Sequence, residues 1–587
     1  MTAFNYPDIF DVAVIGAGHA GCEAALSAAR LGAKTLLLTQ DLDTIAAMSC
    51  NPSIGGVGKG QLVREIDALG GEMAKIADLS MLCGHMLNTS KGAAVRSPRA
   101  QCDKKMYQLA MKQVLERQPG LLIVQGEAAS ILTRAGRVAG VMTVRHTRYR
   151  AKTVIITAGT FLRGIIHVGL DSFPGGRYNH PPSSHLSASL KELGFKLGRL
   201  KTGTPMRLNG RSIDFSKCER QDADSPPAPF SHFTGGIKNP QLPCWLTRTT
   251  AKTAAVIRAG LHNSPLYSGK IKSIGPRYCP SIEDKVVKFP HHGEHHLFLE
   301  PEGFNTAEYY VNGLSTSLPE ETQAEIVRSV PGLEKAEIMR AAYAIEYDYS
   351  DPGQLDYTLE TRLVPGLFTA GQVNGTTGYE EAAAQGLIAG INAARWALGG
   401  GQLILRRDEA YIGVMIDDLV SKGVDEPYRI FTSRAEYRLL LRADNADLRL
   451  APHGFALGLL DPALKENFEA YRGAVEEHKS DKRPARALGR GPWTTENARV
   501  EAAIEKTYAI YIERNRKQAE RMKKFEGLRI PADLNYSGLK ALPNEARHKL
   551  EKNRPLTLAQ AGRLPGVTPA DIQLLWVLLE QRRKARE

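Results

Sequence analysis

The fold is decided by residues 11–39, which read DVAVIGAGHAGCEAALSAARLGAKTLLLT. The apolar run Asp11–Ile15 predicts a buried strand, the alanine-rich segment His19–Leu31 a helix, and Lys34–Thr39 a second strand. Between the first strand and the helix lies the glycine turn Gly16–Gly21, with the spacing GxGxxG. A strand, a glycine turn and a helix in this order predict the start of a nucleotide-binding α/β domain.

Each glycine of the turn has a separate physical reason. Gly16 allows the tight turn, Gly18 lets a pyrophosphate approach the backbone, and Gly21 permits close packing of helix and strand, while the helix N-terminus attracts the phosphates. A ribose-binding acidic residue is expected after the second strand, where the sequence offers Gln40 and Asp41. Neither residue is a carboxylate placed directly at the end of the strand, so the turn by itself leaves open whether the ligand is FAD or NAD.

Two later segments resemble the first strand in composition, Lys152–Ala158 and Gly366–Ala370, and each ends at a glycine. Their wide separation indicates one domain interrupted by an insertion. We therefore predict an α/β fold with a Rossmann-like FAD-binding domain, an inserted α/β NADH-binding domain and an α-helical C-terminal region. The expected segments are residues 1–204 (FAD-binding domain, first part), 205–345 (insertion), 346–400 (FAD-binding domain, second part) and 401–587 (helical region).

The composition is that of a soluble globular protein, with 43% hydrophobic and 24% charged residues in 587. No apolar run approaches the roughly 18 residues of a membrane span, and Met1–Phe10 has no signal pattern. These features favour a cytoplasmic protein without a membrane partner. The net charge of +13 is compatible with a polyanionic partner. Seven scattered cysteines without a CxxC spacing predict neither a disulfide framework nor a metal site.

Two further glycine-rich segments extend the predicted cofactor site. Asn51–Gly60 (NPSIGGVGKG) is a loop whose backbone can lie against a flat ring system, and Lys59 does not fit a Walker A motif. Gly371–Gly386 (GQVNGTTGYEEAAAQG) joins a strand to an alanine-rich helix, whose N-terminus is suited to stabilise negative charge on a reduced flavin. From these loops we expect cofactor contacts from Asn51, Gly55, Gly56, Gly58, Lys59, Gly371, Asn374, Gly375 and Gly378.

Together the segments resemble one family, the FAD-carrying large subunit of the tRNA uridine 5-carboxymethylaminomethyl modification enzyme, also called glucose-inhibited division protein A. The matching motifs run in order along nearly the whole chain. They are DVAVIGAGHAGCEAA (11–25), MSCNPSIGGVGKG (48–60), GPRYCPSIEDK (275–285), FLEPEG (298–303), NGLSTSLP (312–319), AIEYD (344–348), GQVNGTTGYEEAAAQG (371–386), EPYRIFTSRAEYRLLLRADNADLRL (426–450) and RLPGVTPADI (563–572).

The resemblance implies an activity and partners. It implies that the chain adds a carboxymethylaminomethyl or aminomethyl group to C5 of the wobble uridine of certain tRNAs. FAD would be the bound cofactor, methylenetetrahydrofolate the one-carbon donor and NADH the reductant. The family forms homodimers, which pair with a tRNA-modification GTPase into a heterotetramer, and the helical C-terminal region would bind tRNA and this GTPase.

The resemblance also implies site residues. FAD contacts would come from Gly16, Ala17, Gly18, His19, Ala20, Gly21, Ala128, Ser183 and Gln372. NAD contacts would come from Gly275, Pro276, Arg277, Tyr278, Cys279, Pro280, Ser281, Ile282, Glu283, Asp284, Lys285, Val286, Val287, Lys288 and Phe289. Cys50, beside the glycine loop, and Cys279, near Arg277, match the family's paired cysteines, and a thiolate is a suitable activator of uracil C6.

Several alternatives stay open. Arg429, Arg434, Arg438 and Arg442 lie among aromatic residues, which suits tRNA binding and a salt-bridged helix equally well. The histidine-rich segment 291–296 indicates an exposed loop more than a metal site. The rival functions are a folate- and FAD-dependent tRNA uridine-54 methyltransferase, a small-molecule flavin dehydrogenase and a non-catalytic RNA-binding scaffold.

Overall fold

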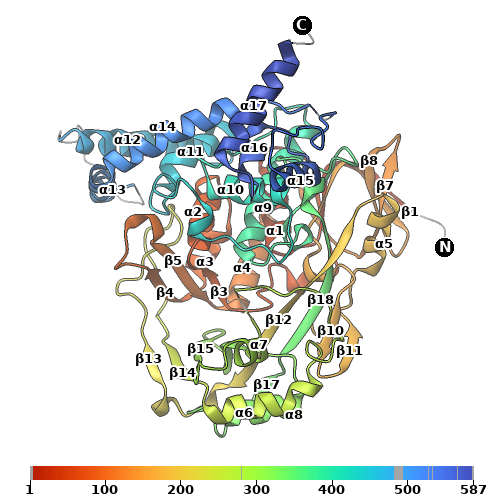
Figure 1. The fold of residues 1–587 in the computed structure, drawn as a ribbon. Helices are drawn as coiled ribbons and strands as arrows, with labels where there is room; N and C mark the ends of the chain where they lie inside the picture. The colour runs from red at the N-terminus through yellow and green to blue at the C-terminus, as the bar shows by residue number, and fades with distance from the viewer. Residues whose placement is uncertain are drawn as a thin grey trace.

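The computed structural model describes residues 4–278, 280–481, 493–526, 528–531, 533–564 and 566–584. Two large sheets lie one above the other in Figure 1, and the C-terminal helices cover the upper one. Cys279 lies outside the described residues. The α/β fold class with a helical C-terminal region is therefore confirmed.

The first sheet contains the predicted strands. Its order is β6-β2-β1-β9-β8-β7, with β19 also beside β9, and β1 pairs in parallel with both β2 and β9. Val12 faces Thr35 on one side and Thr153 on the other, so the strand is central, and the apolar residues of its second half, from Phe10 to Ile15, are buried. The strands are β1 (Phe4–Ile15), β2 (Thr35–Thr39), β6 (Leu121–Gln125), β7 (Ala128–Arg134), β8 (Arg137–Thr143), β9 (Thr147–Ile156) and β19 (Leu367–Thr369).

Two helices from distant parts of the chain pack together against this sheet. They are α1 (His19–Arg30) and α9 (Tyr379–Ala397). A Cβ atom at Gly386 would lie 2.0 Å from the carbonyl oxygen of Ala20, and one at Gly390 would lie 2.2 Å from Oγ of Ser27. Only glycine allows this close approach, which brings the third glycine-rich segment next to the first.

The second sheet has the order β11-β10-β18-β12-β16-β15-β14-β13, with β17 beside β12. The predicted domain boundaries, 204/205 and 345/346, fall inside its two central strands, β12 and β18, which pair from Leu197–Ser350 to Thr204–Tyr343. This sheet also begins earlier than the predicted insertion, at β10. Its strands are β10 (Ile165–Val168), β11 (Asp171–Pro174), β12 (Leu197–Asn209), β13 (Glu219–Gln221), β14 (Cys244–Arg248), β15 (His296–Pro301), β16 (Glu308–Ser315), β17 (Ile338–Arg340) and β18 (Tyr343–Ser350).

Smaller elements complete these two layers. A three-stranded sheet, β3-β5-β4, adjoins the first domain, and α6, α7 and α8 contribute to the core under the second sheet. The bounds are β3 (Ser53–Gly55), β4 (Met81–Leu87), β5 (Ser97–Cys102), α2 (Lys59–Ala68), α3 (Met73–Leu79), α4 (Lys104–Arg117), α5 (Ser184–Glu192), α6 (Ala251–Gly260), α7 (Ile282–Lys288) and α8 (Glu320–Arg328).

The C-terminal region is helical, as predicted, and packs in three parts. α10 and α11 share the core of the first domain, α12 and α13 form a second cluster, and α15, α16 and α17 form a third. Within the described residues, no helix has the length and apolar character of a membrane span. The helices are α10 (Tyr411–Lys422), α11 (Ala446–Leu457), α12 (Lys465–Lys479), α13 (Thr495–Thr507), α14 (Ala509–Glu526), α15 (Asn544–Asn553), α16 (Leu558–Arg563) and α17 (Pro569–Lys584).

Candidate dinucleotide-binding and active site

A cavity of about 620 Å³ opens at the carboxyl ends of β1, β2 and β9. Its walls come from both large sheets, from the glycine turn Gly16–Gly21, from the loop around Cys50 and from the segment Arg429–Phe431. Ligands of open α/β sheets bind at this edge, because the loops that follow parallel strands converge there. The cavity is therefore the candidate site.

Most of the predicted cofactor residues line this cavity, and Gln40 and Asp41 line it as well. Gly21, Gly58, Asn374 and Gly375 do not line it, and their positions are explained by contacts or conformations of the protein itself. A Cβ atom at Gly21 would lie 1.8 Å from the carbonyl oxygen of Gly16, and one at Gly58 would lie 2.8 Å from Cα of Phe431. Asn374 is buried and bonded to Thr369 and Gln385, and Gly375 adopts a left-handed φ of 80°. The residues that line the cavity are Gly16, Ala17, Gly18, His19, Ala20, Asn51, Gly55, Gly56, Lys59, Ala128, Ser183, Gly371, Gln372 and Gly378.

The glycine turn fits a diphosphate. Gly18 caps α1, whose first N–H groups receive no side-chain cap. A Cβ atom at Gly18 or at Gly56 would meet no protein atom within 4 Å, although both glycines line the cavity. Open space next to uncapped helix N–H groups is what a bound phosphate requires. The residues present therefore fit the diphosphate of an extended dinucleotide such as FAD.

His19 is a neutral side chain in this site. Its ring stacks on that of Tyr379, with centroids 4.4 Å apart, and Nε2 is buried without a hydrogen-bond partner among the described residues. Burial, with a smaller effect from Lys59, lowers the pKa of His19 to about 4. The uncharged ring thus keeps a buried polar atom that has no partner among the described residues.

We expect the pKa of His19 to give the apoprotein a characteristic pH dependence. In the unfolded chain His19 takes up a proton near pH 6.5, whereas in the folded chain it does so only near pH 4. The free energy of unfolding should therefore fall by up to about 3 kcal/mol as the pH drops through this window. Urea unfolding at several pH values measures this slope. His19→Gln should reduce it, and equal slopes for the two proteins would contradict the assignment.

Lys59 is committed to protein contacts rather than to phosphate. Its Nζ lies 2.8 Å from Glu380 and 3.2 Å from Glu381, and all three side chains are buried. Glu380 also accepts the Gly55 N–H at 2.7 Å. Burial opposes ionisation of Glu380, but Lys59 outweighs it and lowers the pKa of that carboxyl. The buried ions tie the second glycine loop to the start of α9, and the carboxylates offset the positive end of that helix.

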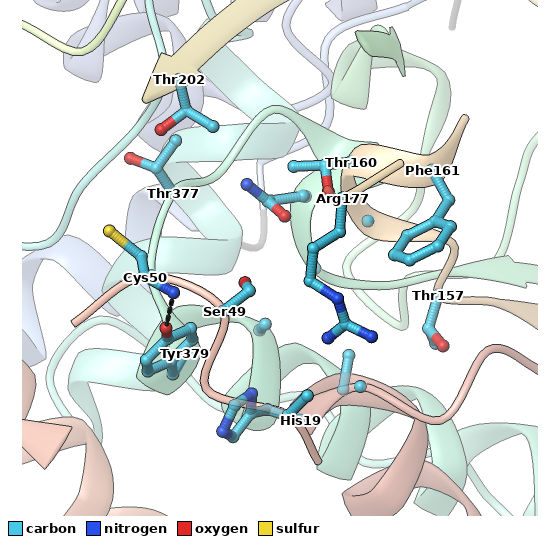
Figure 2. A pocket seen from close by; sticks show the side chains of 18 of the residues that line it. His19, Ser49, Cys50, Thr157, Thr160, Phe161, Arg177, Thr202, Thr377 and Tyr379 are labelled. Atoms are coloured by element: carbon cyan, nitrogen blue, oxygen red, sulfur yellow. Dashed lines mark hydrogen bonds between the residues drawn. The ribbon is translucent and has the colours of Figure 1, made fainter. Parts of the chain in front are cut away.

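Cys50 lies in the cavity wall and is held from several sides. Its N–H donates to Tyr379 Oη at 2.7 Å (Figure 2), and its carbonyl oxygen accepts from Lys104 at 3.0 Å and Arg207 at 2.8 Å. Its sulfur lies 3.4 Å from Tyr310 Oη. The thiol predicted to be catalytic is therefore fixed at the same cavity as the glycine turn.

A buried ion cluster supports Cys50 from behind. Glu302 bridges Lys104 and Arg207, the two residues that bind the Cys50 carbonyl oxygen. Burial opposes ionisation of Glu302, but the two cations outweigh it and lower its pKa. Burial, together with Arg207, lowers the pKa of Lys104 to about 8.

The predicted NAD segment is divided between two environments. Pro276 and Tyr278 line the cavity, and the ring of Tyr278 lies 4.2 Å from that of Phe431. The neighbours of Cys279 thus reach the cavity that contains Cys50, although Cys279 itself lies outside the described residues. The NAD contacts of this segment remain a prediction.

The second half of the segment forms α7, and some of its side chains have structural roles. Ile282 and Val286 are buried in the core under the second sheet. Glu283 is buried and accepts from Thr316 Oγ1 at 2.9 Å. These three side chains face the protein interior, so they are not placed to contact NAD, and an NAD contact through the backbone of this segment stays a prediction.

The four predicted tRNA-binding arginines are not equivalent. Arg429 lines the cavity and Arg438 is exposed, so both are accessible. Arg434 is partly buried, with its guanidinium 4.3 Å from the Tyr428 ring. Arg442 has no exposed surface and pairs with Asp444, Glu501 and Glu505. The structure therefore corrects the prediction for Arg442, whose buried guanidinium has no face to offer a phosphate.

Several cavity residues escaped the sequence analysis. Tyr310 and Tyr379 contact Cys50, and Arg177 projects into the cavity. Tyr379 lies inside the segment Gly371–Gly386, whose glycines gave a signal, whereas Tyr310 and Arg177 lie outside the glycine-rich segments from which cofactor contacts were predicted. Within the described part of the chain, no group of three His, Cys, Asp or Glu side chains is arranged to hold a metal.

The sheet order and the glycine turn that opens into this cavity define the class of dinucleotide-binding α/β proteins. The sequence profile described as "Glucose inhibited division protein A" matches residues 11–400, and that of the "tRNA modifying enzyme MnmG/GidA C-terminal helical bundle" matches residues 518–587. The chain belongs to the glucose inhibited division protein A family.

Relatives and a solved structure agree along almost the full length. The chain is 52% identical to the "tRNA uridine 5-carboxymethylaminomethyl modification enzyme MnmG" of Geotalea uraniireducens, covering 98% of this chain and 99% of that one. It is also 52% identical to the protein of the same name from Geobacillus kaustophilus, with 98% of each chain covered. A crystal structure of Aquifex aeolicus GidA superposes with a TM-score of 0.89 at 50% identity, covering 97% of this chain and all of that one.

Proposed function

We propose that this chain is an FAD-dependent enzyme that adds a carboxymethylaminomethyl or aminomethyl group to C5 of the wobble uridine of tRNA. The relatives support this proposal, because the chain is 52% identical over nearly its full length to proteins named for this modification. The observation in the structure that carries the proposal is the Cys50 thiol in the same cavity as the glycine turn. A nucleophile beside a redox cofactor suits C5 substitution of a pyrimidine.

The chemistry of Cys50 follows from the electronic structure of uracil, whose C5 is a weak nucleophile until a nucleophile adds to C6. The Cys50 thiolate forms a bond to C6, and the electron pair of the C5–C6 double bond moves toward O4. C5 then attacks the methylene carbon of an iminium formed from the one-carbon unit and the amine of the product, and the π pair of the C=N bond moves onto that nitrogen. Loss of the proton from C5 restores the double bond and expels the thiolate. Tyr310, 3.4 Å from the sulfur, is placed to hydrogen bond with it.

The cofactor and the co-substrates supply the redox chemistry, the carbon and the electrons of the reaction. Bound FAD supplies the redox chemistry of the reaction. Methylenetetrahydrofolate provides the carbon, and NADH provides electrons from a site that includes the first part of residues 275–289. Pro276 and Tyr278, which line the cavity, support this placement. Cys279 is the second proposed catalytic thiol.

The tRNA contact is proposed from accessible arginines near the cavity, and the GTPase partner and the homodimer are proposed from the resemblance to the family. Arg429 at the cavity and the exposed Arg438 are suited to phosphates of the anticodon loop. The α-helical region supplies the surface for tRNA and for the GTPase partner, with a homodimer of this chain at the centre of a heterotetramer. The proposed location is the cytoplasm.

Mass spectrometry of tRNA nucleosides tests the function directly. A strain that lacks this gene should lose the modified wobble uridine and regain it when the chain is expressed from a plasmid. Loss of 5-methyluridine at position 54 would instead indicate the methyltransferase. Unchanged tRNA would favour a small-molecule dehydrogenase. Purified protein should also be yellow, and a protein that stays colourless with excess FAD would contradict the flavoprotein assignment.

A further inference from the structure

Arg177 is a cation in the cavity that the proposed reaction does not use. It stands in a short segment after β11, residues 175–180, which we call the strap. The strap is folded on itself, because the His180 N–H donates to the Arg177 carbonyl oxygen at 2.9 Å. Its far end reaches the ribose-binding position predicted after β2, where His180 Nε2 lies 3.6 Å from Asp41 Oδ2. The strap thus borders the first-domain side of the cavity.

The side chain of Arg177 forms no ion pair with an acidic residue in the described part of the chain. Its guanidinium makes no hydrogen bond or ion pair with any residue that the structure describes. Its charged group lies over the face of Phe161, at 5.8 Å from the ring centroid. Burial lowers the pKa of Arg177, and Asp41 offsets this only in part. A partly buried guanidinium without a partner is costly, which indicates that an anion binds there.

The direction of the side chain indicates where this anion lies. In Figure 2 Arg177 extends across the pocket toward the side that carries Thr157 and His19. Thr157 donates through Oγ1 to the Gly16 carbonyl oxygen at 3.0 Å, so this side is the wall formed by the glycine turn. The guanidinium is therefore directed toward the wall that carries the glycine turn, where a Cβ atom at Gly18 would meet no protein atom within 4 Å.

We propose that Arg177 binds the diphosphate of FAD from the side opposite the glycine turn. The two negative charges are then held between the N-terminus of α1 and the strap, and the planar guanidinium can contact two phosphate oxygens at once. The proposal rests on FAD as the bound dinucleotide. It adds a side-chain contact to a site that otherwise consists of backbone N–H groups.

Ligand fragments separate a diphosphate contact from other roles. We would measure the affinities of FAD, ADP and riboflavin by titration calorimetry for the wild-type apoprotein, Arg177→Gln and Arg177→Lys. Arg177→Gln should weaken FAD and ADP by about 10- to 100-fold, the range for a hydrogen bond to a charged group, and leave riboflavin unchanged. Arg177→Lys should recover part of the loss, because it keeps the charge without the two-pronged geometry.

Arg211→Gln, at an exposed arginine of the second sheet's domain, is the matched control and should bind FAD like the wild type. If Arg177→Gln melts at a lower temperature, the milder Arg177→Lys variant decides the question. Unchanged FAD affinity in that variant and in Arg177→Gln would overturn the proposal. So would a loss of affinity for methylenetetrahydrofolate alone, because Arg177 would then bind folate carboxylates. A wild-type protein that fails to bind FAD would overturn the proposed function as well.

Discussion

Replacing Cys50 with serine is expected to abolish wobble-uridine modification while FAD stays bound. Serine keeps the size of the side chain but is a far weaker nucleophile at neutral pH, so addition to C6 fails and the rate should fall by at least about 10³-fold. The backbone bonds of Cys50 to Tyr379, Lys104 and Arg207 do not involve sulfur and should survive. The measurement is modified nucleoside formed per minute by purified protein with its partner, tRNA and co-substrates.

Cys218→Ser is the matched control. Cys218 is also a partly exposed free thiol, but it lies outside the cavity, near Asp214. The Cys218→Ser substitution should leave the rate within about twofold of wild type, as expected for a surface substitution away from the site. Flavin absorbance of each variant reports whether FAD remains bound. If Cys50→Ser retains a tenth of the activity or more, covalent activation by Cys50 is wrong.

The sequence predicted the part of the site that local patterns encode. The glycine turn, the strand Asp11–Ile15 and the helix that starts at His19 are specified by neighbouring residues, and the structure has them where expected. Gly386 was predicted within a helix that follows a strand. Its close contact with Ala20 explains why the two glycine-rich segments meet. Such elements can be predicted from the sequence because glycine spacing and strand periodicity depend only on neighbouring residues.

The rest of the site depends on contacts between distant parts of the chain. Tyr310 reaches Cys50 across 260 residues of sequence, and the Lys59–Glu380 pair spans 321. Nothing near Lys59 in the sequence shows that two glutamates neutralise it. Arg442 failed as a predicted tRNA contact for the same reason, since its partner Glu501 lies on a helix that folds back over it. The predicted junction at 204/205 falls inside β12, which continues as a strand through Gly203 and Pro205, because pairing with β18 and β16 overrides these two turn-forming residues.

A pair of alanine substitutions in the glycine turn should separate cofactor binding from folding. Gly18 has φ −74° and ψ −171°, which any residue adopts, and a Cβ atom there meets no protein atom within 4 Å. Gly18→Ala should therefore fold like the wild type. Its methyl group, and more so that of Gly18→Val, would occupy the space of the diphosphate. We expect FAD affinity to fall on the order of 100-fold for valine, the equivalent of about 3 kcal/mol.

Gly21→Ala should behave differently, although the change is chemically the same. Its Cβ atom would lie 1.8 Å from the Gly16 carbonyl oxygen, so the turn or α1 must move. Overpacking of this kind destabilises a protein by about 1–3 kcal/mol, and FAD affinity should fall as a consequence of the displaced turn. Melting of the apoproteins and FAD titration of both variants measure the two effects. If Gly18→Val binds FAD as tightly as the wild type, the diphosphate does not lie above this turn, and the cavity holds its cofactor in another orientation.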